Sequence, residues 1–569
     1  MNLVTLSVTL LSLVLCALSL FSLYLMLYAW EHPTRLAASS GPQSFLPPRL
    51  SFTVLLPARH EEAVIHETIR RVWAANYPSD LLEVVVVCHA DDEGTIAQAQ
   101  RAVHEIGSPH VRVETFANAP INKPHGLNVG FQRTANQVVT VFDAEDDIDA
   151  DIFNVVNTVM LGEEVGIVQA GVQLMNFRDH WFSIHNCLEY FFWFKSRLHF
   201  HAAVGMIPLG GNTVFIRRPL IARVGGWDEN CLTEDAEIGL RLSLLGEPIR
   251  VVYDPQYVTR EETPDTLSSF IKQRTRWNQG FLQVLVKGAW RGLPRQTQRL
   301  LAVYTLSYPF FQALLLLLWP LTISAVVWLK VPLVVALVSF LPLYAFLFQM
   351  ITTIIGAFIF ARAYGYKVPI LMPLTMAITF VPFQLLQSVS AVRAVYRALR
   401  GQANWEKTAH VGAHRLAETV AFGGQVISAG GLEALLHEVT AHLGVERASI
   451  MVLDPVAHTF SIQASQGLPD EVVRSTRVNA DDGVAGWVAQ TGRPAIINDR
   501  PAPHDLACRL AQPALRSAIV LPIEQRDAPL AILSLSSART LLGDDALRWV
   551  DDRVRQVVED RVLTAASVA

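Results

Sequence analysis

Apolar residues are concentrated in three long stretches of the chain, and shorter apolar runs alternate with polar ones elsewhere. The first long stretch, Leu3 to Trp30, contains no charged residue. At about 1.5 Å of rise per residue, a helix of this length crosses a bilayer. It has neither the basic start nor the short apolar core of a secretory signal. Residues 1–30 are therefore predicted to form a retained transmembrane helix.

The second and third apolar stretches form one membrane region, which we place at residues 299–396. Residues 300–360 have Lys330 as their only charge. A lysine is costly at the centre of a bilayer, so this stretch is predicted to form two spans that turn near Lys330. Residues 368–392 are predicted to form the next apolar segment.

The residues between the first helix and the membrane region alternate between two patterns. Short β-rich apolar runs at 51–58 and 81–90 are followed by helical patterns at 61–75 and 93–107. This alternation predicts an α/β domain whose parallel sheet is covered on both faces. Ligands of such sheets bind at the carboxyl ends of the strands. The residues at these ends are acidic: Asp91, Asp92 and the run Asp143 to Asp147.

Composition and charge narrow the classes of function. The 569 residues are 51% hydrophobic, with a mean hydropathy of +0.31, which is too apolar for a soluble protein of this size. The formal net charge of −5 gives no support for a nucleic-acid partner. The five cysteines lack paired spacing, which argues against a disulfide framework or a zinc site and favours a reducing compartment.

Two acidic clusters are candidates for chemistry. The run DAEDD at 143–147 would suit magnesium or manganese, which bind one or two carboxylates together with substrate phosphates. A plain turn at the end of a strand is the alternative, because Asp is common in turns. The segment LTEDAEIGLRL at 232–242 places three carboxylates at the start of an amphipathic helix. An ordinary helix capped by Thr233 would also explain them.

Taken together, these segments resemble the membrane-embedded family 2 glycosyltransferases, which include cellulose, chitin and hyaluronan synthases. The resemblance covers about residues 50–400, and it implies a nucleotide-sugar-binding α/β domain of the GT-A type at 50–295. Its most specific motifs are TED and QRTRW. The matching segments, in chain order, are PARHEE (57–62), Asp91-Asp92, NKPHGLN (122–128), FDAEDD (142–147), LGGNTVFIRR (209–218), WDENCLTEDAEIGLRL (227–242) and QRTRW (273–277).

The resemblance implies roles for the residues at the strand ends. Asp91 or Asp92 would contact the nucleotide base, and Lys123 would contact the diphosphate of a nucleotide-sugar donor, expected to be UDP-linked. Asp143 and Glu145 would bind the divalent metal, although Glu145 stands where the family usually has Asp.

The remaining implied roles concern transfer itself. Asp235 would be the general base, because a sugar hydroxyl is a poor nucleophile until a carboxylate takes its proton. Glu234 is a second catalytic candidate, and both Glu234 and Glu237 could instead be solvated helix charges. The family implies inverting transfer to a growing glycan or a lipid-linked acceptor. The residues expected at the acceptor site and the membrane interface are Gln273, Arg276 and Trp277.

The topology of the membrane region contains a conflict. Residues 266–292, which contain the QRTRW motif, mix aromatic and aliphatic residues with Lys and Arg, and this mixture predicts an interfacial helix. Three simple spans after the domain would place the two soluble regions on opposite sides of the plasma membrane. We expect both regions to be cytoplasmic, because basic residues precede the second one. One segment should therefore depart from a simple span, and we expect it to be the stretch containing Pro369, Pro373 and Pro382.

Residues 428–565 resemble a GAF domain, an α+β fold around a small-molecule pocket. The resemblance rests on segments 431–454, 461–473, 481–499 and 515–537. Its ligand is not identified by the sequence. Cys508 is followed by Arg509 where chromophore-binding GAF domains usually have His, so a bound tetrapyrrole is disfavoured. A structural or dimerising role without a ligand is an alternative, and self-association is left open.

Two classes of function follow from these observations. One is an active membrane glycosyltransferase that builds or exports a glycan under the control of the GAF domain. The other is a membrane-anchored GAF signalling protein with a degenerate transferase scaffold. The aspartates, the TED motif and QRTRW favour the active enzyme.

Overall fold

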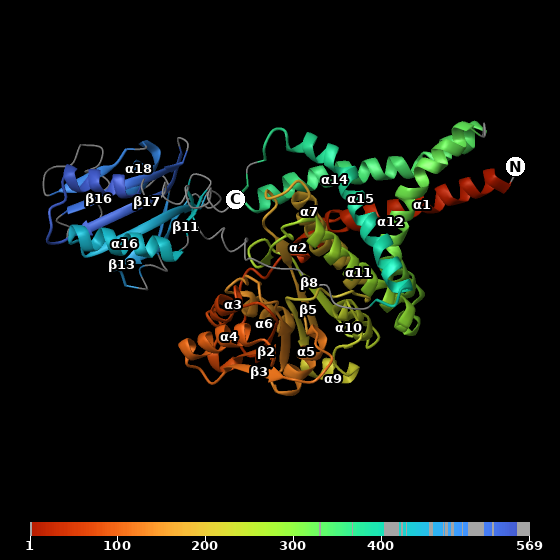
Figure 1. Cartoon of the computed structure of the whole chain (residues 1–569), viewed down its shortest axis with the longest axis horizontal. Helices are drawn as coiled ribbons and strands as arrows, with labels where there is room; N and C mark the ends of the chain where they lie inside the picture. The colour runs from red at the N-terminus through yellow and green to blue at the C-terminus, as the bar shows by residue number, and fades with distance from the viewer. Residues whose placement is uncertain are drawn as a thin grey trace. The chain divides into compact units, whose positions relative to one another are not determined.

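The chain divides into two compact units, Met1–His414 and Arg415–Ala569 (Figure 1). Lys330, where we expect a turn between spans, and Cys508 lie outside the described residues. The computed structural model describes residues 3–328, 332–366 and 368–402 of the first unit, and residues 420–422, 425–427, 429–454, 459–469, 472, 476–479, 483–491, 493–498, 517–525 and 528–554 of the second.

The first unit is built around a seven-stranded sheet with the order β3-β2-β1-β4-β7-β5-β8. Its strands are parallel except β7, which is antiparallel to both β4 and β5. The prediction of a parallel sheet is therefore wrong at β7, where the chain leaves the sheet through helices and returns from the opposite direction. The strands are β1 (Phe52–Ala58), β2 (Leu82–His89), β3 (Val111–Phe116), β4 (Val138–Val141), β5 (Ile167–Ala170), β7 (Val214–Arg217) and β8 (Ile249–Val252).

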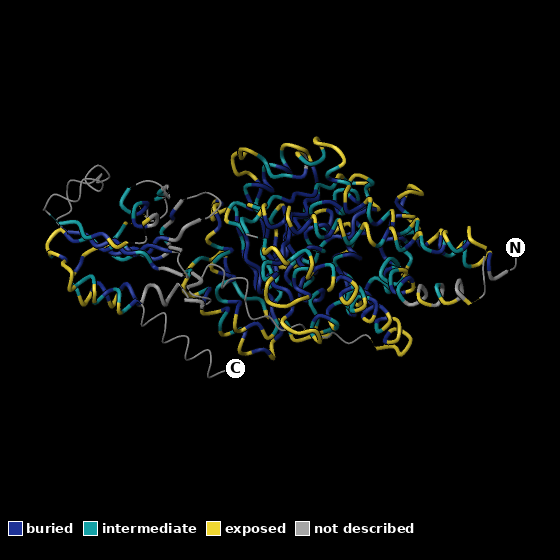
Figure 2. The backbone as a smooth tube through the Cα atoms, turned by 90° about the horizontal axis from the view of Figure 1, so that it is seen from above, coloured by how far each residue is buried: buried dark blue, intermediate teal, exposed yellow. Residues whose placement is uncertain are grey.

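Helices cover both faces of this sheet, because alternate strand residues point in opposite directions. Val54 and Leu56 of β1 join the hydrophobic core on one face, whereas Leu55 joins the core on the other. Figure 2 shows buried backbone in dark blue in the interior and exposed backbone in yellow at the surface. The first face carries α3 (Ile65–Trp73), α4 (Glu93–Ile106) and α6 (Ile152–Gly162); the second carries α5 (Lys123–Gln132), α9 (Arg218–Val224) and α10 (Glu234–Ser243).

Three further helices and a small second sheet lie between β5 and the membrane region. α7 (Ser183–Phe192) and α8 (Leu198–Val204) are joined by a π-helical segment at Trp193–Arg197. Strands β6 (Val172–Leu174) and β9 (Thr259–Glu261) pair in parallel. α11 (Leu267–Lys287) corresponds to the interfacial helix expected at 266–292.

Apolar helices are gathered at one end of the first unit (Figure 1). Within the described residues, four stretches are long and apolar enough to cross a membrane: Thr5–Trp30, Gln296–Leu316, Leu333–Ala363 and Met372–Leu399. They belong to α1 (Leu3–Leu27) with the short turn Tyr28–Trp30, α12 (Gln296–Trp328), α13 (Leu333–Ser339) with α14 (Leu341–Ala363), and α15 (Met372–Leu399).

α15 packs side by side with α11 and has two different faces. Phe383 contacts Phe270 of α11 with ring centroids 5.7 Å apart, and the Arg397 Nε donates a hydrogen bond to the Gln279 Oε1 at 3.1 Å. Pro382 does not interrupt the helix. The opposite face exposes apolar side chains at helical spacing: Leu374, Ile378, Val381, Leu385, Val389, Val392 and Leu399.

The C-terminal unit contains an antiparallel six-stranded sheet with the order β14-β13-β12-β17-β16-β15. α16 (Ala429–Leu443) packs on one face through Leu436 and Val439, and α18 (Gly483–Thr491) packs on the other through Val488. The strands are β12 (Arg447–Asp454), β13 (Thr459–Gln466), β14 (Arg477–Asn479), β15 (Ala495–Asn498), β16 (Ser517–Gln525) and β17 (Ala528–Ser537), with a separate hairpin β10–β11 (Val420–Phe422, Gln425–Ile427).

Candidate functional site

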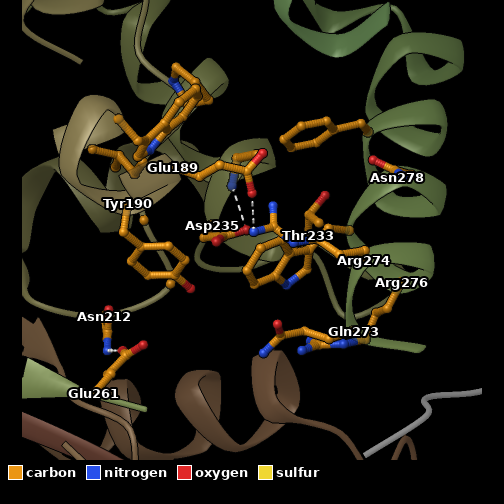
Figure 3. Close-up of a pocket in the computed structure, with 18 of the residues that line it drawn as sticks. Glu189, Tyr190, Asn212, Thr233, Asp235, Glu261, Gln273, Arg274, Arg276 and Asn278 are labelled. Atoms are coloured by element: carbon orange, nitrogen blue, oxygen red, sulfur yellow. Dashed lines mark hydrogen bonds and ion pairs between the residues drawn. The ribbon is translucent and has the colours of Figure 1, made fainter. Parts of the chain in front are cut away.

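One cavity of about 810 Å³ extends through the first unit. It begins at the carboxyl ends of β1 and β2, passes the start of α10 and the face of α11, and reaches residues of α12, α14 and α15. Figure 3 shows part of its lining, with Tyr190 and Glu189 from α7 facing Gln273, Arg274 and Arg276 from α11. The cavity therefore connects strand ends, where nucleotides bind in α/β folds, to the apolar helices.

The TED segment lies at the centre of this cavity. Thr233 is at the N-cap position of α10, but its side chain makes no capping hydrogen bond, so the expected Thr233 cap is wrong. Instead, the Asp235 Oδ1 accepts a hydrogen bond from the Ala236 backbone N–H at 2.8 Å. Thr233 packs against Gly280 of α11, which has no side chain to keep the two helices apart. The Thr233 Oγ1 is buried and has no hydrogen-bond partner within the described residues.

Lys123, at the start of α5, connects the acidic residues of two segments. Its ammonium forms an ion pair with Asp143, lies 4.0 Å from the Glu234 Oε1 and donates to the Gly211 carbonyl at 3.1 Å. Burial alone would lower the pKa of Lys123, but the carboxylates of Asp143 and Glu234 raise it above its ordinary value. Lys123 is therefore a fixed cation in the cavity.

Glu234 is buried, and its neighbour Asp235 is half-buried. Burial raises the pKa of Glu234 to about 7, with Lys123 opposing and Asp235 supporting the shift. Burial also raises the pKa of Asp235. A carboxylate with a raised pKa that faces a cavity is a stronger base than a solvated one, which suits proton abstraction. Glu237 differs, because it binds Arg241 through both oxygens and is a buried structural residue.

The DAEDD segment contributes to an acidic group at one wall of the cavity. The Asn212 Nδ2 donates to both oxygens of Asp146 at 2.8 Å and also to Glu261 (Figure 3). Burial and the neighbouring carboxylates raise the pKa of Asp146 and of Glu261, the latter to about 7. Asp143 and Glu145 line the cavity in front of this group.

This acidic wall fits a divalent cation in its donor chemistry. Asp143 and Glu145 present hard carboxylate oxygens, and burial together with these neighbouring carboxylates raises the pKa of Asp146 and Glu261. Among the residues that the structure describes, no group of three or more His, Cys, Asp or Glu side chains could hold a metal alone. Two carboxylates completed by substrate phosphates remain compatible with this arrangement.

α11 supplies the opposite wall. Gln273, Arg276 and Trp277 all line the cavity, and the Trp277 ring lies 6.3 Å from the Tyr190 ring. Arg274, between them, donates a hydrogen bond to Glu189 of α7 at 2.6 Å. The Gln387 Nε2 of α15 donates to both Glu189 oxygens at 2.8 Å.

The two aspartates after β2 have different environments. Asp92 accepts hydrogen bonds from the backbone N–H groups of His60, at 2.6 Å, and Thr95, at 3.3 Å, so it caps α4. Asp91 is half exposed and binds His89 and Arg59. Of this group, Arg59, His60 and His89 line the cavity.

The inner end of the cavity carries glutamines although it lies between apolar helices. Beside apolar side chains such as Phe380 and Phe383, each of the three candidate spans after the α/β domain contributes at least one glutamine to the lining: Gln312, Gln349, Gln384 and Gln387. Gln312 donates to Gln384, and the Gln349 Nε2 donates to the Ser19 carbonyl of α1 at 2.8 Å. Polar side chains are expensive in such helices and usually face a substrate path or a water-filled cavity.

Comparison with known families assigns both units. Residues 47–280 match the model of the glycosyltransferase-like family 2, and residues 431–559 match the GAF domain. The chain carries a family 2 glycosyltransferase domain and a GAF domain. The resemblance drawn from the motifs is thereby confirmed, as is the fold class: a GT-A-like α/β transferase domain, apolar helices and an α+β GAF domain.

The transferase domain is similar to proteins of known or inferred activity. A probable glycosyltransferase of Bacillus subtilis (YdaM) is 28% identical over 46% of this chain and 61% of its own length. A beta-monoglucosyldiacylglycerol synthase of Trichormus variabilis is 26% identical over 41% of this chain and 49% of its own. The matches thus span about half of these relatives. A solved mannosyltransferase from Pyrobaculum calidifontis, in complex with GDP-Man and Mn2+, gives a TM-score of 0.45 at 19% identity, covering 69% of this chain and 99% of that one.

The transferase domain brings most of the predicted site residues to one cavity. Lys123, Asp143, Glu145, Glu234, Asp235, Gln273, Arg276 and Trp277 line it, whereas Asp91 and Asp92 do not. Their roles stay predictions. Four further residues of the cavity have no role predicted from the sequence: Glu189, Tyr190, Arg274 and Glu261. No pattern marks Glu189, Tyr190 or Glu261, but Arg274 lies inside QRTRW, and Asn212 belongs to the matching segment LGGNTVFIRR.

Proposed function

We propose that this protein is a membrane glycosyltransferase that moves a sugar from a UDP-linked donor to a hydroxyl of a glycan by a single inverting displacement. The observation that carries this proposal is the continuous cavity from the strand ends, past the TED segment, to the glutamines of the apolar helices. A donor enters at the strand ends and an acceptor at the helix end, and the two meet at Asp235.

In this reaction Asp235 takes the proton of the acceptor hydroxyl as the oxygen attacks the anomeric carbon. The bond between that carbon and the diphosphate oxygen breaks, and the diphosphate leaves with both electrons. Lys123, held by Asp143 and Glu234, is the cation that would offset the negative charge developing on the departing diphosphate. Arg276 and Trp277 position the acceptor against the opposite wall.

Asp143 and Glu145 are the residues that would hold a magnesium or manganese ion. Bound there with the donor phosphates, such an ion neutralises charge on the leaving diphosphate. Asp146 and Glu261 lie behind them, and Asn212 binds both, which keeps the acidic wall in place.

The glutamines at the inner end of the cavity support a glycan acceptor. Gln312, Gln349 and Gln384 present amide groups that match sugar hydroxyls, and apolar side chains such as Phe380 and Phe383 beside them offer surfaces for sugar rings. A lipid-linked acceptor is the alternative suggested by the glucosyldiacylglycerol synthase relative. A glycan attached to a lipid would agree both with the glutamines of the cavity and with this relative.

The arrangement of α15 supports cytoplasmic placement of both domains at the plasma membrane. Its inner face hydrogen-bonds the transferase domain through Gln387 and Arg397, and its outer face is apolar. An amphipathic helix of this kind lies along a membrane interface. With α15 at the interface, only two crossings follow the transferase domain within the described residues, α12 and then α13 with α14. These two crossings return the chain to the side of the transferase domain.

The test is a transfer assay with the purified full chain in lipid nanodiscs, supplied with labelled nucleotide sugars and magnesium or manganese. Transfer from a UDP-sugar that is lost on chelation of the metal is expected. Asp235→Asn is the matched control, since it keeps the shape of the side chain but cannot take the proton. Binding of a UDP-sugar without any transfer, to a glycan or a lipid acceptor, would instead favour a degenerate scaffold under a signalling GAF domain.

A further inference from the structure

The donor end of the cavity contains a histidine that the proposed chemistry does not use. His89 is the last residue of β2, is 8% exposed and lines the cavity. The edge of the neighbouring Phe116 ring, at the end of β3, approaches it at a centroid distance of 5.2 Å. Arg59 follows the end of β1 in the same part of the cavity. This is where the carboxyl ends of three adjacent parallel strands meet, which is the usual place for a nucleotide base.

Asp91 determines which nitrogen of His89 carries the proton. The His89 Nδ1 is hydrogen-bonded to the Asp91 Oδ1, and because an ionised carboxylate can only accept, Nδ1 is the nitrogen that carries the proton. The Arg59 Nη2 donates to the other Asp91 oxygen at 3.3 Å. The hydrogen bond from His89 lowers the pKa of Asp91, so that this group is an ionised acceptor. With Nδ1 protonated, the Nε2 of a neutral ring presents a lone pair.

That lone pair is unused within the described part of the chain. The His89 Nε2 is buried and has no hydrogen-bond partner there. A buried acceptor without a partner costs free energy, and a bound ligand with a matching donor would recover it. Asp92 does not line the cavity, and its oxygens accept hydrogen bonds from the backbone N–H groups of His60 and Thr95 instead.

We propose that His89 reads the base of the nucleotide donor through Nε2, and that Asp91 is the residue that positions it. The Nε2 would accept a hydrogen bond from a ring N–H, which uracil presents at N3 and guanine at N1. Cytosine and adenine present a ring nitrogen lone pair at the corresponding positions, so two acceptors would face each other. This inference rests on the proposed transferase function and restricts the base that the site selects to uracil or guanine.

The test measures binding of UDP, GDP, CDP and ADP to the full chain in nanodiscs with magnesium at pH 8. UDP, GDP or both are expected to bind on the order of tenfold more tightly than CDP and ADP, the value of one well-placed hydrogen bond. The comparison of UDP with GDP then identifies the base. His89→Phe keeps the packing against Phe116 but removes the acceptor, so it should abolish the preference.

Three further variants separate base recognition by His89 from a merely structural effect. His66→Phe is the matched control: His66 also binds a carboxylate, Glu105 at 3.0 Å, but it does not line the cavity, so the preference should persist. Asp91→Ala frees the ring and should reduce the preference, and Asp91→Asn should restore most of it, because the amide oxygen still accepts from Nδ1–H.

Equal binding of all four nucleotides, or an unchanged preference in His89→Phe, would overturn the role of His89 while leaving the transferase function intact. Absence of binding by every nucleotide would refute both proposals. A preference that Asp91→Asn loses as fully as Asp91→Ala would refute the positioning role of Asp91.

Discussion

Adding a single methyl group at Gly280 should impair catalysis without preventing folding. A Cβ at this position would lie 2.8 Å from the Thr233 Cβ and closer still to its Cγ2 and Oγ1, whereas ordinary van der Waals contact begins at 3.4 Å. Thr233 would therefore retreat by at least about half an ångström, taking the start of α10 and Asp235 with it. Misplacement of a catalytic group by about 1 Å can cost roughly 100-fold in rate. We expect Gly280→Ala to lower kcat by roughly 10- to 100-fold.

In Gly280→Ala, we expect the KM for the donor and the melting temperature to change little. Ala is a better helix residue than Gly, which offsets part of the strain. Transfer rates and thermal unfolding curves, both measured in nanodiscs, test this expectation for Gly280→Ala. Gly162→Ala is the matched control, since a Cβ there meets nothing within 4 Å. Adding Thr233→Ala removes the two closest atoms and should restore part of the rate. A wild-type kcat in Gly280→Ala would refute the reasoning, as would a double variant that recovers nothing.

The remaining predictions concern the base, its pH dependence and the GAF domain. Asp235→Asn should lose about 100- to 10,000-fold in kcat while binding donor nearly as well, and normal turnover would show that Asp235 is not the base. Because burial raises the pKa of Asp235 and brings that of Glu234 to about 7, kcat should fall as the pH drops through this raised range, not near the ~4 of a free carboxyl group. A pH–rate profile whose acid limb lies near pH 4 would contradict this. Truncation after residue 412 should leave transfer measurable but change its rate by at most about 5- to 150-fold. Gln279→Leu should reduce the rate change caused by truncation, because Gln279 hydrogen-bonds Arg397 of α15 and the Gln402 carbonyl just after it. Loss of all transfer on truncation, with donor binding intact, would refute a regulatory role for the GAF domain.

The elements of the chain were largely predictable from local pattern. Continuous apolar runs predicted β1 and β2, because a strand buried on both faces has no polar side. The four long apolar helices follow equally directly from length and hydropathy. The TED and QRTRW motifs located the carboxylates and the α11 wall, since both depend on residues close together in sequence.

Contacts between distant segments could be decided only by the tertiary structure. The antiparallel β7 depends on how the chain returns from α8, which no local pattern records. Thr233 was a reasonable cap by propensity, yet its side chain packs on Gly280, 47 positions away in the numbering, instead of capping α10.

The same reason separates the two aspartates after β2. They are adjacent in sequence and chemically identical, so sequence alone predicted one role for the pair. In the fold, the His60 and Thr95 backbone N–H groups bind Asp92, whereas Asp91 meets the side chains of His89 and Arg59. The residue type sets which hydrogen bonds a carboxylate can accept, and the packing of β1, β2 and α4 decides which donors reach it.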